Sequence, residues 1–143
     1  MLQIFSCPPF TPFYRGVCER IADQREGEPD LLLHDGDGPL AVQITAVEGQ
    51  VKMNKAVEVV GQSARFRPSG YVVIGRPEFH ALAIRAAMDH AAAGTNFKLI
   101  TISDLCEMYV RVLERRLDTR RVARILLEER GLIDHEVIER ASA

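Results

Sequence analysis

Two short apolar runs separated by a strong turn signal constrain the fold of this chain more than any other feature. The first run is Leu31 to His34, the second is Leu40 to Val47, and Asp35-Gly36-Asp37-Gly38-Pro39 lies between them. Asp-Gly pairs supply the positive φ angles that tight hairpin loops require. The sequence therefore predicts an antiparallel pair of strands.

Downstream of this hairpin, helical and strand patterns alternate. We expect a helix over Lys55 to Phe66, a buried strand over Tyr71 to Ile74, a helix over Phe79 to Ala93, a strand over Phe97 to Ile102, and a helix capped by Ser103 that runs through Leu117. This order predicts an α/β fold, a mixed central sheet flanked by helices on both faces.

The two ends of the chain carry helical patterns. Phe13, Val17 and Ile21 recur at four-residue spacing, so residues near 13 to 25 are predicted to form an amphipathic helix, with Glu19 off its apolar face. Residues 118–143 resemble a small C-terminal helical appendage of the domain formed by residues 1–117. In this appendage Thr119 and Asp134 are the expected helix caps.

Composition limits the classes of function. A chain of 143 residues is long enough for one domain with a hydrophobic core, and its formal net charge of −2 gives no overall attraction to nucleic acid. The odd number of cysteines, without CxxC spacing, is typical of a reducing compartment. No apolar stretch approaches a membrane span or a signal peptide, so we expect a cytoplasmic protein.

Polar residues gather where the hairpin begins. Asp30 follows Pro29 directly before the first strand, and Gln43 and Thr45 share one face of the second strand because residues two apart point the same way. Val42 and Ile44 are then expected to enter the core. From the residues alone, Asp30 is as well explained as a turn-former as it is as a metal ligand.

Taken together, these segments resemble the PD-(D/E)XK nuclease superfamily of restriction-endonuclease-like domains. The resemblance covers roughly residues 12 to 117. It rests on Glu28-Pro29-Asp30, the hairpin, the Leu40 to Val47 strand, a helix containing Gln62, Gly70 to Gly75, and Leu99 to Leu105. It implies a restriction-endonuclease-like fold and Mg²⁺-dependent hydrolysis of DNA phosphodiester bonds.

The resemblance also implies roles for individual residues. Asp30 matches the motif aspartate, Gln43 falls on the position of the second acidic residue, and Glu19 matches the glutamate of the first helix. These three are the implied Mg²⁺ ligands, with Asp30 and Gln43 catalytic. A glutamine in place of a carboxylate removes a full negative charge from the cation's ligands, and the affinity for Mg²⁺ should fall accordingly.

The lysine of the motif is missing. Thr45 occupies its position, and a hydroxyl cannot supply the positive charge that attack on a phosphodiester requires. Lys52 and Lys55, at the start of the following helix, are the nearby candidates for a relocated catalytic lysine. As ordinary surface lysines they would have no such role.

Two hypotheses about function therefore remain. The first is a Mg²⁺-dependent DNA endonuclease with a variant site, for which a homodimer is plausible because cutting both strands needs two sites. The second is a nuclease-fold protein without catalysis that serves as a nucleic-acid-binding or protein-assembly module. An arginine-rich run between Arg115 and Arg124 could contact phosphates, although the acidic residues among it are typical of a solvated helix face.

Overall fold

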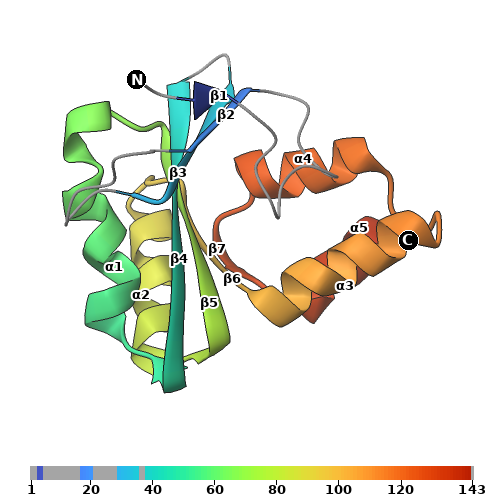
Figure 1. Cartoon of the computed structure of the whole chain (residues 1–143). Coiled ribbons are helices and arrows are strands. Elements are labelled where there is room, and N and C mark those ends of the chain that lie inside the picture. The colour runs from blue at the N-terminus through green and yellow to red at the C-terminus, as the bar shows by residue number, and fades with distance from the viewer. Residues whose placement is uncertain (1–2, 5–16, 21–28, 36–37, 143) are drawn as a thin grey trace.

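A seven-stranded mixed sheet forms the centre of the protein (Figure 1). The computed structural model describes residues 3–4, 17–20, 29–35 and 38–142. Along the sheet the strands follow their order in the sequence: β1 (Gln3–Ile4), β2 (Val17–Arg20), β3 (Leu31–Asp35), β4 (Gly38–Val51), β5 (Gly70–Phe79), β6 (Phe97–Thr101) and β7 (Gly131–Ile133).

Helices cover both faces of this sheet, as the sequence predicts. The described helices are α1 (Met53–Gln62), α2 (Ala81–Ala92), α3 (Ile102–Leu113), α4 (Thr119–Glu128) and α5 (His135–Ser142), with a 3₁₀ turn at Ala64–Phe66. Helices α1 and α2 lie on one face, and α3, α4 and α5 lie on the other (Figure 1). The crossover from β6 to β7 therefore has the opposite hand to the crossovers through α1 and α2.

The predicted hairpin is confirmed. Strands β3 and β4 pair antiparallel from Leu31–Val42 to Asp35–Gly38. Strands β4, β5, β6 and β7 are parallel to one another. Strand β4 thus joins the antiparallel and the parallel halves, and its 14 residues extend beyond the predicted end at Val47.

Each face of the sheet has its own apolar core. Side chains alternate between the faces along each strand, so Val72 and Ile74 pack beneath α3, α4 and α5, whereas Val73 packs beneath α1 and α2. Two glycines allow close packing: a Cβ on Gly75 would lie 2.5 Å from the Phe79 ring, and one on Gly70 would lie 2.7 Å from the Asn96 amide.

Several predicted elements differ in the structure. Residues 17–20, placed in a helix by their periodicity, form β2 because pairing with β3 satisfies their backbone groups; the rest of the predicted helix at 13–25 lies outside the described residues. Thr101, not Ser103, caps α3, and Asp118, not Thr119, caps α4. The C-terminal segment is helical as predicted, but it also contributes β7 to the sheet.

Among the described residues, no helix combines the length and the apolar character needed to cross a bilayer.

Candidate functional site

Asp30 lies at the entrance of β3, and its carboxylate belongs to the hairpin. Its Oδ2 accepts a hydrogen bond of 2.8 Å from the backbone N–H of Ile44, and its own N–H donates to the carbonyl of Val42 at 3.0 Å. A carboxylate that accepts from a backbone N–H makes a charge-assisted bond, which is stronger than one between neutral groups. The side chain thus extends the β3–β4 ladder beyond Leu31.

Gln43 and Thr45 do share one face of β4, the face covered by α1 and α2. Ala41 on the same face packs into the core beneath these helices, whereas Val42 packs into the other core. The expectation that Ile44 enters the core is wrong, since Ile44 is 38% exposed. Thr45, by contrast, is only 4% exposed because helices cover its face of this inner strand.

Among the described residues, four buried oxygen atoms on this side of the sheet have no hydrogen-bond partner. They are Oε1 of Gln43, Oγ1 of Thr45, Oε1 of Gln62 and Oγ of Ser63. Gln62 ends α1 and Ser63 is its C-cap, on the inward face of the helix that also buries Ala56 and Val59. Leaving a buried polar group unpaired costs about 1–3 kcal/mol of folding free energy. These four oxygen atoms can therefore still accept hydrogen bonds.

The sequence analysis did not identify Ser63 as one of the buried polar residues beside β4, and it named Gln62 only as part of the helix in the family resemblance. Spacing from Ala56 and Val59 predicts that Ser63 faces inward. The sequence gives no signal that its hydroxyl lacks a partner, since partners come from elements distant in the chain.

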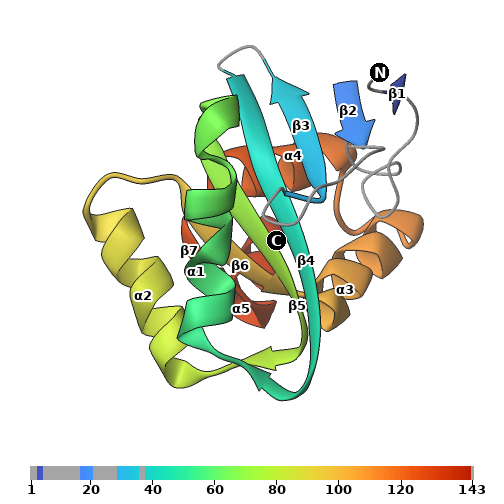
Figure 2. The ribbon, with the colours of Figure 1, turned by 60° about the vertical axis from the view of Figure 1, so that its left-hand side comes forward.

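Both candidate lysines follow the C-terminal end of β4 at Val51, whereas Asp30 contacts Ile44 in the middle of that strand. Figure 2 shows β4 continuing beyond the start of β3 before α1 begins. At about 3.3 Å per strand residue, Lys52 is about 26 Å along the chain from Ile44, the residue that Asp30 contacts. Lys52 is the N-cap of α1 and is exposed. Lys55 is exposed too, and its Nζ lies 3.1 Å from Oε2 of Glu58. The structure therefore does not bring either lysine to Asp30.

Glu19 lies on strand β2 and not on a helix. It pairs with Leu32 on β3 and with Ile4 on β1. The reason for proposing it as a ligand, its match to a glutamate on the first helix, does not apply to a strand residue in this position.

The described residues contain no group of three or more His, Cys, Asp or Glu side chains placed to hold a metal ion. One oxygen of the Asp30 carboxylate already accepts the Ile44 N–H. Mg²⁺ binds through one or two carboxylates at near-octahedral geometry, and the other candidate donors here, Gln43 and Thr45, are neutral.

A second buried polar group lies on the opposite face of the sheet, where β6 meets α4. Lys98 is fully buried, and its Nζ donates to Oδ1 of Asn96 at 2.6 Å. The Asn96 amide in turn donates to the carbonyl of Leu127 in the last turn of α4 at 2.9 Å. Burial, and then the charge of Arg130, lower the pKa of Lys98 to about 7, while Glu129 acts in the opposite direction.

Comparison of the chain with models of protein families, with characterised proteins and with solved structures gave no match.

Proposed function

We propose that this protein is a non-catalytic assembly module on a restriction-endonuclease-like scaffold, and that it forms a homodimer through α3. The observation behind the proposal is an apolar stripe on the outward face of α3. Tyr109 is 42% exposed, Val110 48% and Leu113 64%, and Cys106 is exposed one turn earlier. Positions i, i+3, i+4 and i+7 adjoin on a helix, so these side chains form one surface.

Such a surface favours a protein partner over solvent. Contiguous exposed apolar patches are typical of interaction sites, whereas single exposed apolar residues need no explanation. Helix α3 already packs its other side, with Leu105 and Met108, into the core. A second copy is the partner we propose, because a two-fold axis lets one patch pair with itself.

Three features argue against catalysis in this proposal. The Asp30 carboxylate is engaged with the Ile44 N–H, the side chain at the lysine position is a buried threonine, and Lys52 and Lys55 lie at the far end of β4. Within the part of the chain that the structure describes, neither the motif position nor Lys52 and Lys55 would thus supply a positive charge to a phosphodiester at Asp30. The odd cysteine count and the lack of CxxC spacing support a cytoplasmic location for the module.

Analytical ultracentrifugation tests the proposal. We expect the wild-type chain to sediment as a dimer and Leu113→Glu as a folded monomer. Leu82→Glu is the matched control, since Leu82 is 54% exposed on α2, on the other face of the sheet, and this variant should remain a dimer. A wild-type chain that stays monomeric at high micromolar concentration contradicts the proposal, as does a Leu113→Glu variant that still dimerises.

The Mg²⁺-dependent DNA endonuclease is the second candidate. One observation favours it: the oxygens of Gln43 and Thr45, on neighbouring positions of one strand face close to the backbone that Asp30 contacts, are without hydrogen-bond partners. Incubation of plasmid DNA with the protein and Mg²⁺ or Mn²⁺ tests it. Cleavage that Asp30→Ala abolishes would support this candidate and count against the first.

A further inference from the structure

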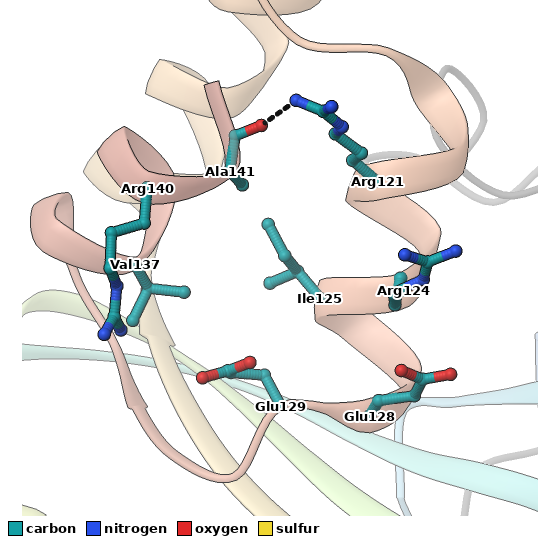
Figure 3. A pocket seen from close by; sticks show the side chains of 8 residues that line it. All are labelled: Arg121, Arg124, Ile125, Glu128, Glu129, Val137, Arg140 and Ala141. Atoms are coloured by element: carbon teal, nitrogen blue, oxygen red, sulfur yellow. Dashed lines mark hydrogen bonds between the residues drawn. The ribbon is translucent and has the colours of Figure 1, made fainter. Parts of the chain in front are cut away.

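A groove with a volume of about 520 Å³ lies between α4 and α5, away from the candidate site on β4 (Figure 3). Its lining residues are Arg121, Arg124, Ile125, Glu128, Glu129, Val137, Arg140 and Ala141. Small-molecule sites in proteins typically enclose about 300–1,000 Å³. The groove is therefore large enough for a small organic ligand.

The floor of the groove is apolar. Ile125 projects from α4 between the two helices, and Val137 and Ala141 face it from α5 (Figure 3). All three pack against the core beneath α3, α4 and α5, which fixes their positions. An apolar body laid on this floor would remove hydrocarbon surface from water on both partners.

The lining of the groove also includes Arg121, Arg124 and Arg140. The Nη1 of Arg121 donates to the carbonyl of Ala141 at 2.8 Å, which holds its guanidinium across the groove from α4 to α5 (Figure 3). Among the described residues, neither Arg124 nor Arg140 makes a side-chain hydrogen bond or an ion pair. Planar guanidinium groups bind carboxylates and phosphates through paired N–H donors, and these two are available for that.

The charges along α4 are ordered. Arg121 lies in the first turn of the helix, Arg124 lies near its middle, Glu128 is its last residue and Glu129 is its C-cap (Figure 3). The helix dipole has the same direction, positive at the N-terminus. A ligand with one anionic group would place it beside the arginines, whereas a polyanion lying along the groove would also meet the two glutamates.

We propose that the α4–α5 groove is a binding site for a small amphipathic molecule with a single anionic group, a carboxylate or a phosphate monoester, attached to an apolar body. The anionic group contacts one of the two, Arg124 on the α4 side or Arg140 on the α5 side, which lie on opposite sides of the groove (Figure 3), and the body covers Ile125 and Val137. The site is independent of dimerisation through α3, because none of the groove residues belongs to the α3 stripe.

Isothermal titration calorimetry with defined probes tests the proposal. The probes are 4-phenylbutyrate, phenyl phosphate, the uncharged alcohol 4-phenylbutanol and inorganic phosphate. For ligands of this size we expect dissociation constants on the order of 1 mM for the phenylbutyrate or the phenyl phosphate. The alcohol and inorganic phosphate should bind at least about tenfold more weakly, because the alcohol lacks the anionic group and inorganic phosphate lacks the apolar body. The stronger of the two organic anions identifies the preferred anionic group.

Variants locate the site. One of the two substitutions, Arg124→Gln or Arg140→Gln, should weaken binding of the preferred anion about fivefold or more, in line with loss of one charge-assisted contact, and the arginine concerned is the one that holds the anionic group. Arg85→Gln, an exposed arginine on α2, is the matched control and should bind as the wild type does. The monomeric Leu113→Glu variant should bind equally well, which separates this site from the proposed dimer.

Three results would overturn the proposal. They are the absence of binding by both organic anions at 10 mM (about tenfold above the expected dissociation constant), equal binding of the alcohol and the acid, and binding that neither arginine substitution weakens. Tighter binding of a single-stranded oligonucleotide that displaces phenylbutyrate would also overturn it, because the groove would then accept a polyanion.

Discussion

The carboxylate of Asp30 and the backbone N–H of Ile44 are joined by a hydrogen bond of 2.8 Å across the open end of the β3–β4 hairpin. Pro29 precedes Asp30, and the chain bends there before β3 begins. A strand that ends at this point would leave the Ile44 N–H without a carbonyl from β3. The side chain of Asp30 supplies the missing acceptor, which gives this residue a structural role.

Asp30→Ala should lower the free energy of unfolding by about 1.5–3 kcal/mol, because it removes a charged acceptor and leaves the Ile44 N–H unpaired. Asp30→Asn should lower it less, since the amide oxygen can still accept. Urea denaturation with and without Mg²⁺ measures both effects, and Asp89→Asn, on the exposed side of α2, serves as the control. A loss of stability that appears only with Mg²⁺ would instead indicate a metal-binding role for Asp30.

Thr45→Lys should not create a nuclease, although it restores the lysine of the motif. The side chain at this position is 4% exposed, so a lysine would bury a charge and lower the free energy of unfolding by more than about 2 kcal/mol. Urea denaturation and a plasmid cleavage assay with Mg²⁺ test this. A stable Thr45→Lys variant that cleaves DNA would contradict the non-catalytic proposal.

Thr45→Val should raise the free energy of unfolding by about 1 kcal/mol, because it removes a buried hydroxyl without a partner and keeps the shape of the side chain. Thr101→Val provides a control of opposite sign. The Thr101 Oγ1 accepts from the Asp104 N–H at 3.1 Å, and loss of this helix cap should cost about 1 kcal/mol. Equal destabilisation of both variants would mean that Thr45 has a hydrogen-bond partner in solution.

Lys98 should make stability rise with pH above neutrality. Its pKa is lowered from 10.5 to about 7 in the folded protein, so between these values the unfolded chain binds a proton that the folded chain does not. Stability must then increase with pH over this interval. The urea midpoint of the wild type should rise from pH 7 to pH 9.5, and that of Lys98→Met should rise less. The urea midpoint of Lys55→Met should depend on pH as that of the wild type does. If the midpoint of Lys98→Met rose with pH as steeply as that of the wild type, the lowered pKa of Lys98 would be contradicted.

Glu139 should contribute to stability until strong acid is reached. Its hydrogen bond with Arg111, at 2.6 Å, lowers the pKa of Glu139 below 4.5. The contribution is complete above the pKa of the unfolded chain and is lost as pH falls through the lower, folded pKa. Thermal denaturation between pH 7 and pH 2.5 should show this loss in the wild type and a smaller one in Glu139→Gln. Glu136→Gln, on the same helix, should behave as the wild type does.

The sequence determined the order and type of most elements from the hairpin onward, because local chemistry specifies them. The Asp-Gly turn predicts the β3–β4 pair, and the β-branched run at Tyr71 to Ile74 predicts an inner strand, both confirmed. The shared face of Gln43 and Thr45 follows from the period of a strand. The sequence also predicts that Asp30 lies at the start of β3, because it directly precedes the first apolar run of the hairpin.

Only the tertiary structure decided what these residues contact. Pairing with β3 made a strand of Val17–Arg20 despite its helical spacing, and the length of β4 carried Lys52 away from Asp30. Burial of Thr45 and Lys98 depends on helices far along the chain. Such contacts join residues that the sequence separates, and a local pattern contains no information on which of its polar atoms will find a partner.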